Sequence, residues 1–239
     1  MFNRFRTRSR KLERIDTGDY TGEEYDRFLK EIRLINLYAG DRRALSGSLL
    51  SEIERRDDPA ISLLDIGAGS GELLRVAAKF ADKRSSRALL CGLELSGRSA
   101  RSIMEESRRF HQIHHIQGDA LDLPFLANSF DYVICSLFTH HFIDDDIVSI
   151  LKSISSIARK KIYVIDLHRH IVAYGLFKVI TRALMISDLV REDGALSVLR
   201  GFKPDELERL AELSGLDNYR VRRSFPFRLV LEAETGEIR

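Results

Sequence analysis

A run of glycines at every second position is the first feature of this sequence that could do chemistry. The segment from Asp65 to Gly71 reads Asp-Ile-Gly-Ala-Gly-Ser-Gly and directly follows an apolar run. Glycine has no side chain, so the backbone here can turn sharply and a ligand can lie against it. If the apolar run is a strand of an open α/β sheet, the glycines stand at its carboxyl end, where such sheets bind ligands. The segment therefore predicts a ligand-binding loop.

The spacing of these glycines excludes two common nucleotide-binding loops. A dinucleotide fingerprint that starts at Gly67 requires a glycine where the chain has Glu72. A Walker loop requires Gly-Lys-Ser/Thr, which does not follow. Three glycines alone are weak support for any one ligand, so their surroundings must decide which ligand the loop takes.

The elements that must position this loop alternate between strand and helix, which is typical of a parallel sheet with helices on both faces. Strands are predicted at 61–66, 88–93, 113–117, 132–138 and 162–167, and helices at 73–80, 96–110, 144–158 and 204–214. Two helical patterns, 23–36 and 41–54, precede the first strand, and two apolar runs, 219–225 and 227–233, meet at Pro226 as a hairpin. The sequence therefore predicts a doubly wound, Rossmann-like α/β fold: a seven-stranded sheet, mostly parallel, with a C-terminal antiparallel hairpin and N-terminal helices.

Length and composition agree with one such domain and an extension. We expect a basic arm with a helical extension over 1–58, and a ligand-binding domain over 59–239 that carries a helical insertion near 169–200. Apolar residues make up 44% of the 239 residues, and the formal net charge is only +2. So small a charge gives no field that steers the whole molecule toward nucleic acid. The two cysteines, Cys91 and Cys135, fall in apolar runs, which favours buried thiols in a reducing cytoplasm.

Two segments bear on contact with membranes. Residues 1–11 hold five basic residues and no apolar stretch behind them, so no signal peptide is expected. We interpret this segment as a solvated arm, with weak contact to a membrane surface as the alternative. The longest apolar region, 171–186, is shorter than the ~20 residues that cross a bilayer and is interrupted by Lys178 and Arg182. No transmembrane segment is expected.

The glycine segment resembles the first motif of class I S-adenosylmethionine-dependent methyltransferases, an acid-x-G-x-G-x-G after an apolar strand. Three further segments resemble later motifs of that class in the right order: 91–96, 118–125 and 129–136. The matches cover about residues 60–167. The resemblance implies that the cofactor is S-adenosylmethionine and that residues 59–239 bind it.

The same resemblance implies a role for each matched residue. Asp65 organises the loop and approaches the methionine end of the cofactor. Glu94, at the end of strand two, accepts hydrogen bonds from the ribose hydroxyls, as a carboxylate can from two donors at once. Asp119 lies near the adenine amino group. The full predicted cofactor set is Asp65, Gly67, Ala68, Gly69, Gly71, Glu94, Leu95, Asp119, Ala120 and Ser136.

The exit of strand four narrows the class of acceptor. It reads Ser-Leu-Phe-Thr from Ser136, without the Asn/Asp-Pro-Pro-Tyr-like segment of enzymes that methylate amino groups of nucleic-acid bases. Metal-dependent catechol-type enzymes carry acids after strands four and five, and Ser136 stands in the first of those places. We therefore predict no metal. His114 and His115 do not change this, because adjacent residues on a strand point to opposite faces.

The segment 138–142, Phe-Thr-His-His-Phe, resembles a stretch of the ubiquinone-biosynthesis-like branch of small-molecule methyltransferases. Segments 164–169 and 193–202 are similar to a bacterial subgroup near polyketide and quinone pathways. This second resemblance implies a small, lipophilic, phenolic or quinone-like acceptor, with O-methylation favoured and C-methylation of a quinone or polyketide ring as the alternative. The insertion carries an apolar stripe at 172, 176, 179, 180 and 183, typical of a buried helix face. In this family such a helix often roofs the acceptor pocket.

One of His140, His141 and His168 is predicted to accept the proton of the acceptor hydroxyl. They follow strands four and five, which are neighbours in this fold, and histidine titrates near neutrality. We prefer His141, since family members often keep a histidine there. His168 comes second, because Asp166 could orient it. The alternative is that His141 caps the helix near Asp144 or lines the cofactor.

Two other functions stay open. A macromolecular methyltransferase, acting on RNA or protein, would need a basic, aromatic-rich face; the N-terminal arm and the run 220–223 are the only hints of one. A non-catalytic subunit would bind cofactor without acceptor chemistry, and the intact glycine loop and the histidines argue against it.

Overall fold

The computed structural model describes residues 2–235 and contains a seven-stranded sheet of order β3-β2-β1-β4-β5-β7-β6. The first five strands are parallel, and β7 runs antiparallel to both β5 and β6. The strands are β1 (Ala60–Ile66), β2 (Arg87–Glu94), β3 (Ile113–Gln117), β4 (Phe130–Ser136), β5 (Ala158–Leu167), β6 (Tyr219–Ser224) and β7 (Arg228–Glu234). The predicted Rossmann-like sheet with its C-terminal hairpin is confirmed.

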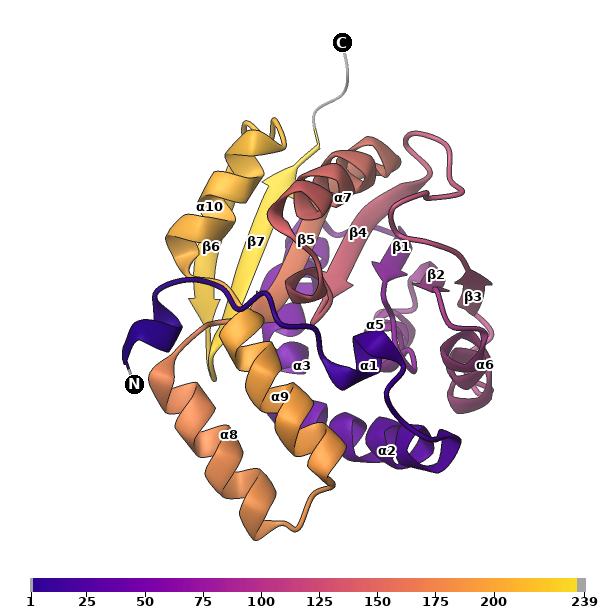
Figure 1. Ribbon diagram of the computed structural model, residues 1–239. Helices are drawn as coiled ribbons and strands as arrows, with labels where there is room; N and C mark the ends of the chain where they lie inside the picture. The colour runs from indigo at the N-terminus through magenta and orange to yellow at the C-terminus, as the bar shows by residue number, and fades with distance from the viewer. Residues whose placement is uncertain (1, 236–239) are drawn as a thin grey trace.

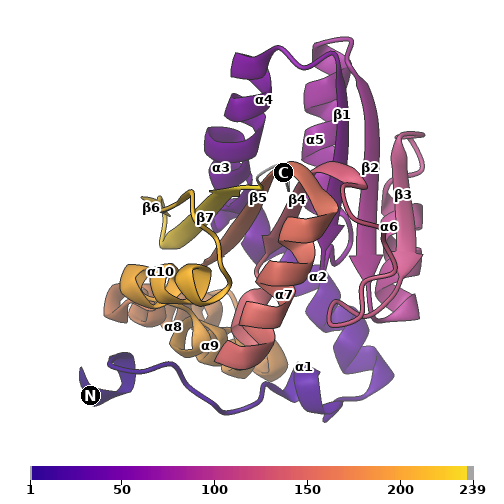
Figure 2. The same cartoon turned by 90° about the horizontal axis from the view of Figure 1, so that it is seen from above.

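Helices cover both faces of this sheet and also its carboxyl edge (Figures 1 and 2). The α-helices are α1 (Arg14–Thr17), α2 (Gly22–Tyr38), α3 (Asp41–Leu45), α4 (Ser51–Arg56), α5 (Glu72–Lys83), α6 (Gly97–Glu106), α7 (Asp144–Ile157), α8 (Ile171–Ala183), α9 (Asp188–Arg200) and α10 (Pro204–Leu213). A π-helical turn, Ser46–Leu50, joins α3 to α4, and single 3-10 turns lie at Phe2–Phe5 and Thr139–His141.

Two apolar cores form because the central strands are buried on both faces, as parallel strands usually are. On one face, α3 to α6 pack on the sheet, with Leu45, Leu74 and Ile103 fully buried. On the other face, α7 and α10 pack through Ile150 and Leu210. Both cores lie beneath the ends of β1, β4 and β5, so these ends are held on a rigid base.

A third layer, built from α1, α2, α8 and α9, lies across the carboxyl ends of the parallel strands (Figure 1). The N-terminal arm ahead of α1 crosses the same edge and is firmly held. Arg8 donates to the backbone oxygen of Arg200 at 2.9 Å, pairs with Asp144 at 2.8 Å, and lies 4.2 Å over the ring of Phe202. The arm is therefore docked through Arg8 and not frayed, while Arg4, Arg6, Arg10 and Lys11 remain exposed as predicted.

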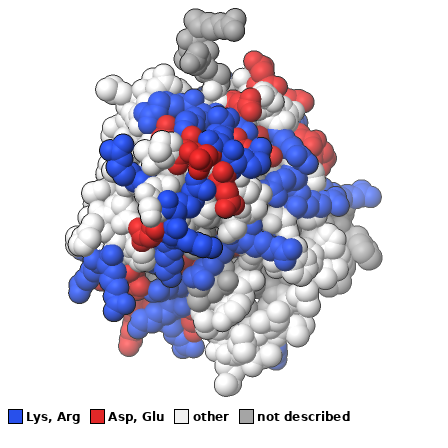
Figure 3. All heavy atoms as spheres, turned by 180° about the vertical axis from the view of Figure 1, so that it is seen from behind, with Lys and Arg blue, Asp and Glu red and all other residues white. Residues whose placement is uncertain are grey.

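The predicted insertion forms two helices, α8 and α9, but the expected burial of its apolar stripe is wrong. Val172, Leu176, Val179 and Ile180 are 47–67% exposed. The corner of the molecule in which α8 lies shows few charged side chains when seen from behind (Figure 3). A different face of α8 packs inward: Thr181 is buried, and only a glycine at 194 leaves room for the ring of Phe177. The periodicity gave the helix correctly but not the face that it buries.

Within residues 2–235, no helix is both long and apolar enough to span a membrane. The division of the chain between residues 58 and 59 stays a prediction. The helices α3 and α4, which come before it, share an apolar core with α5 and the sheet, which come after it.

Candidate active site

The glycine loop joins β1 to α5 and depends on backbone conformations that favour glycine. Gly67, Gly69 and Gly71 have φ values of 68°, 59° and 75°, a left-handed region that costs other residues roughly 1–2 kcal/mol. A Cβ on Gly67 would lie 2.3 Å from the ring of Phe138, so the loop can approach the strand-four exit only with glycine there. A Cβ on Gly69 would meet nothing within 4 Å. The backbone at Gly69 therefore borders open space.

Two carboxylates, Asp65 and Glu94, stand below and beside this loop. Glu94 accepts a hydrogen bond from the N–H of Gly69. Burial raises the pKa of Glu94 to about 7, although hydrogen bonds from the N–H groups of Gly69 and Leu95 lower this pKa in part. Burial also raises the pKa of Asp65 well above its ordinary value, and the charge of Glu94 adds to the shift. Oδ1 of Asp65 is buried and has no hydrogen-bond partner within residues 2–235.

These features fit S-adenosylmethionine, whose methionine end carries an ammonium group and whose ribose carries two hydroxyls. A buried carboxylate oxygen without a partner is costly unless a ligand supplies a donor or a cation, and an ammonium group supplies both for Asp65. Glu94 keeps acceptor capacity for hydroxyls beyond its bond to Gly69. The open space over Gly69 leaves room for the ligand between them.

The remaining predicted cofactor residues follow β2, β3 and β4. Leu95 is 68% exposed beyond the end of β2. Asp119 is exposed, and its side chain accepts from the N–H of Leu121 at 2.9 Å in a turn. Ala120 is buried, and Ser136 is half-buried at the end of β4. Parallel pairing of β1 with β2 and β4, and of β2 with β3, brings all of these strand ends to one edge.

The exit of β4 turns sharply instead of continuing to Phe138. Leu137 has a φ of +50°, and a 3-10 turn, Thr139–His141, follows. Asp166, fully buried in β5, holds this turn by accepting from the hydroxyl of Thr139 at 2.7 Å and from the N–H of His140 at 3.1 Å. The predicted strand 132–138 therefore ends two residues too late, because a carboxylate binds the backbone of the turn there; β4 also begins two residues earlier than predicted.

The three predicted proton acceptors do not lie in one cluster. Nδ1 of His140 is 2.7 Å from Oδ1 of Asp166, and His140 is 3% exposed. The ring of His141 lies 4.2 Å away, and its Nδ1 is 2.8 Å from Oδ1 of Asp16. His168 lies apart from this pair, with its ring 5.5 Å from that of His170. Burial, followed by the charge of Arg223, lowers the pKa of His168 to about 4.

Comparison with known proteins supports the assignment that this geometry indicates. Residues 63–161 match the family model of a methyltransferase domain. The match begins inside β1, contains the glycine loop, Glu94 and the 3-10 turn, and ends inside β5. This match covers about two fifths of the chain and supports an enzyme with a methyltransferase domain that uses S-adenosylmethionine, in agreement with the resemblance found in the sequence.

Solved structures share the fold of this methyltransferase at low sequence identity. A SAM-dependent methyltransferase from Aquifex aeolicus aligns with a TM-score of 0.60 at 12% identity, over 87% of this chain and 98% of the other. Magnesium protoporphyrin IX methyltransferase from Synechocystis PCC 6803 with bound SAM gives 0.59 at 15%, over 95% and 100%. A putative O-methyltransferase from Nostoc punctiforme PCC 73102 gives 0.61 at 18%, over 87% and 59%. Among curated proteins, none matches.

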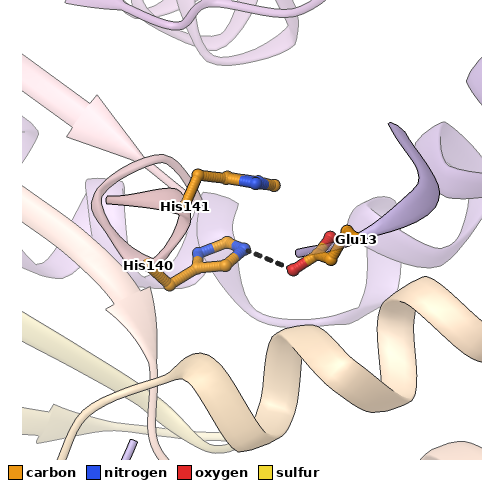
Figure 4. Close-up of side chains that lie close together, drawn as sticks. All are labelled: Glu13, His140 and His141. Atoms are coloured by element: carbon orange, nitrogen blue, oxygen red, sulfur yellow. Dashed lines mark ion pairs between the residues drawn. The ribbon is translucent and has the colours of Figure 1, made fainter. Parts of the chain in front are cut away.

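Two acids that contact His140 and His141, Glu13 and Asp16, were not identified from the sequence. Glu13, 2% exposed, directs its side chain toward His140 and His141 (Figure 4). Oε1 of Glu13 lies 3.9 Å from Nε2 of His140, and Asp16 binds His141 as described. No local spacing could have revealed these contacts, because the partners lie more than a hundred residues apart. The only signal was a pair of acids beside basic residues, Glu13 just ahead of α1 and Asp16 within it.

Arg200, the last residue of α9, ties this cluster together. Its guanidinium donates to the backbone oxygens of Lys11, at 2.7 Å, and of His140, at 2.9 Å, as well as to that of His141. It also pairs with Asp16 at 3.1 Å. The N-terminal arm, the 3-10 turn and the insertion are thereby fixed to one another over the ends of β4 and β5.

Proposed function

We propose that this methyltransferase transfers the methyl group of its cofactor to a small, lipophilic, phenol-like or quinone-like acceptor, with oxygen as the methylated atom. The observation that carries the proposal is enclosure. The carboxyl ends of β4 and β5 lie beneath α1 and α9, and His140 and Asp166 there are 3% and 0% exposed. A protein or nucleic-acid chain needs an open face to reach such groups, whereas a small molecule does not.

Aromatic side chains support an aromatic acceptor. Phe138 lies against the loop at Gly67, and its ring centroid is 4.8 Å from that of Phe142 in a tilted pair. Both follow β4, and they stand directly on either side of Thr139, His140 and His141 in the chain. A planar apolar acceptor would gain from packing against such rings as well as from leaving water.

The residues around this space have distinct proposed roles. We assign Glu94 and Asp65 to the ribose and the methionine end of the cofactor, and the turn after β3 at Asp119 to the adenine. S-adenosylmethionine supplies an activated methyl group, so the protein chiefly has to align the acceptor oxygen with it. The acceptor hydroxyl must also lose its proton, which we assign to the pair His140 and His141.

Within that pair, the geometry supports His140 more than the His141 preferred from sequence. Asp166 accepts from Nδ1 of His140, so in the neutral ring Nε2 is unprotonated and can accept a proton. His168 is less well suited, because a group with a pKa of about 4 is a weak base at neutral pH.

Carbon methylation of a quinone or polyketide ring is the second candidate. The same enclosure and the same aromatic rings would serve it, and a base would then act on a ring position activated by a neighbouring oxygen. The position of the methyl group in the product distinguishes the two.

The test is a methyl-transfer screen with cofactor labelled in its methyl group. Purified protein is offered phenols, quinones, tRNA and a protein mixture, and the labelled products are identified by mass spectrometry. We expect label on phenolic oxygen. Label in tRNA or protein, with all phenols and quinones inert, would contradict the proposal.

A further inference from the structure

The cluster of Glu13, His140 and His141 brings three electron-pair donors together in a largely buried place. Oε1 of Glu13 and one ring nitrogen of each histidine lie within 4.8 Å of one another. Glu13 Oε1 has less than 1 Å² of exposed surface and no hydrogen-bond partner among the described residues. Such an atom is costly to bury unless something in the site compensates it.

The outer contacts of the two rings fix which nitrogen faces the cluster. Nδ1 of His140 meets the carboxylate of Asp166 at 2.7 Å, and Nδ1 of His141 meets that of Asp16 at 2.8 Å. A carboxylate accepts, so each Nδ1 carries the hydrogen, and Nε2 of each neutral ring presents a lone pair. Nε2 of His140 then faces the unpartnered oxygen of Glu13 at 3.9 Å with no donor between them. Among the described residues, the cation that approaches this oxygen is Arg200, whose Nε lies 3.7 Å away.

We propose that Glu13, His140 and His141 form a binding site for one divalent transition metal ion, with Zn²⁺ as the reference ion. Two imidazoles and one carboxylate with open positions are a ligand set that proteins use for zinc and non-haem iron. Metal-binding histidines almost always donate their other N–H to a carboxylate or carbonyl. Asp166 and Asp16 provide that contact to both rings.

The local turn explains how neighbouring residues can bind one ion. On a strand, adjacent side chains point to opposite faces, but His140 and His141 lie on a 3-10 turn, and their rings are only 35° from parallel. Ligand atoms around a tetrahedral Zn²⁺ are about 3.4 Å apart. The widest separation in the cluster would therefore close by about 1.5 Å, shared between two side chains.

The charges around the cluster leave room for a cation. Glu13, Asp16 and Asp166 are three carboxylates, and Arg200 places its Nε 3.7 Å from Oε1 of Glu13. Arg200 already donates to Asp16 and to backbone oxygens. Arg8, which donates to the backbone oxygen of His140, pairs with Asp144. A divalent ion would balance the remaining negative charge; protonation of the histidines is the competing way to do so.

The proposed metal site of Glu13, His140 and His141 differs from the metal site that the sequence analysis considered. No metal was predicted from the sequence, because Ser136 stands where catechol-type enzymes have an acid and because the adjacent His114 and His115 point to opposite faces of a strand; Glu13 was not considered there together with His140 and His141. Here one ligand comes from the N-terminal arm. Binding of the ion stands on the cluster alone. With the ion bound, Nε2 of His140 is a ligand and no longer accepts a proton, so the ion itself would acidify the acceptor hydroxyl in place of His140; this use rests on the proposed function.

The experiment uses full-length, tag-free protein stripped with a chelator and titrated with Zn²⁺ in a calorimeter. We expect one equivalent to bind and to raise the melting temperature, because the ion binds the native state. Glu13→Gln and His141→Ala should each weaken binding at least tenfold. Asp16→Asn should weaken it by about 10- to 100-fold through the ring that it orients. His168→Ala, which changes a histidine outside the cluster, should bind Zn²⁺ as the wild type does.

A Co²⁺ absorption spectrum of the wild-type protein checks the ligand set without any variant and should show a site of low coordination number. Absence of stoichiometric Zn²⁺ binding, or equal binding by Glu13→Gln, would overturn the metal site. If methyl transfer then persists in chelator, the proposed function stands without it. Tight Zn²⁺ binding with no transfer to any small acceptor would support the metal site and contradict the proposed function.

Discussion

The two ends of this active site are built in different ways. At the cofactor end, three glycines within five residues and a carboxylate one strand away supply the main groups. At the acceptor end, Glu13, His140, Asp166 and Arg200 come from four separate parts of the chain. A cofactor site made by one turn and one strand pairing can be recognised from local sequence. An acceptor site made by long-range contacts cannot be recognised in full: His140 could be named from sequence, but Glu13 and Arg200 had to be found in the structure.

The largest effect should come from the acceptor end. His140→Ala removes a nearly buried imidazole beside the proposed acceptor position, and we expect turnover to fall about 10²- to 10⁴-fold. Affinity for S-adenosylhomocysteine should be unchanged, because this side chain lies outside the glycine loop. Steady-state kinetics and calorimetry on folded protein measure both.

His168→Ala is the matched control for that variant. The histidine that it removes lies outside the cluster and follows β5, whereas His140 follows β4. We expect this variant to turn over at near wild-type rates. If His168→Ala is as impaired as His140→Ala, the assignment of the acceptor end to the cluster is wrong.

Gly69→Ala should separate ligand contact from backbone strain at the cofactor end. Its Cβ would enter the open space over the loop, and its φ of +59° disfavours alanine. Gly215→Ala is a control with a φ of +72° and equally open surroundings, far from the loop. Each should lose about 1 kcal/mol of stability, but only Gly69→Ala should lose at least tenfold in cofactor affinity. Equal cofactor binding by both variants would show that the ligand does not approach Gly69.

Cofactor affinity should depend on pH through Glu94. Burial raises the pKa of this carboxyl to about 7 in the free protein, with the buried Asp65 as the neighbouring acid. Only the ionised form can accept from both ribose hydroxyls, so binding below pH 7 must release a proton. Affinity for S-adenosylhomocysteine should rise with pH, by up to about tenfold per unit, and level off above pH 7. Calorimetry from pH 5.5 to 8 measures this; a similar slope in Glu94→Gln would assign it to another group.

The smallest effect is expected on α8, where the sequence predicted a buried stripe. Leu176→Ser and Val179→Ser replace exposed side chains and should each change stability by no more than about 0.5 kcal/mol. Ile150→Ala in α7 removes a fully buried side chain and should cost about 2–5 kcal/mol. Urea denaturation compares them. If the α8 variants lose as much stability as Ile150→Ala, the apolar stripe of α8 is buried in solution, as the sequence predicted.

Periodicity predicted most of the fold because strands and helices here have strong apolar patterns and clear breaks. The five parallel strands, the hairpin at Pro226 and the first helix of the insertion region follow from it, whereas α9 has no such apolar pattern. Which face of α8 is buried could not follow, because Phe177 and Thr181 pack inward only through the room left at Gly194 and the contact with α9. The turn at Leu137 was equally hidden, since Asp166 of another strand holds it.

The roles of the cofactor residues remain predictions, and the structure adds where each of these residues lies. Asp65 and Glu94 could be named from sequence because the segments that hold them resemble methyltransferase motifs, and the parallel pairing of β1 with β2 brings the two strand ends together. Glu13 and Asp16 could not, since nothing in their spacing refers to residues 140 and 141. Their positions become known only when the arm folds across α9.

The central claim, that this fold binds its cofactor between the glycine loop and the end of β2, is tested most directly by calorimetry of S-adenosylhomocysteine with wild type and Glu94→Ala. Glu106→Ala, on α6, is the control for loss of an acid elsewhere. The account predicts that Glu94→Ala weakens binding by about 1–3 kcal/mol, or roughly 5- to 150-fold, with the domain still folded. Unchanged affinity in folded Glu94→Ala would contradict it.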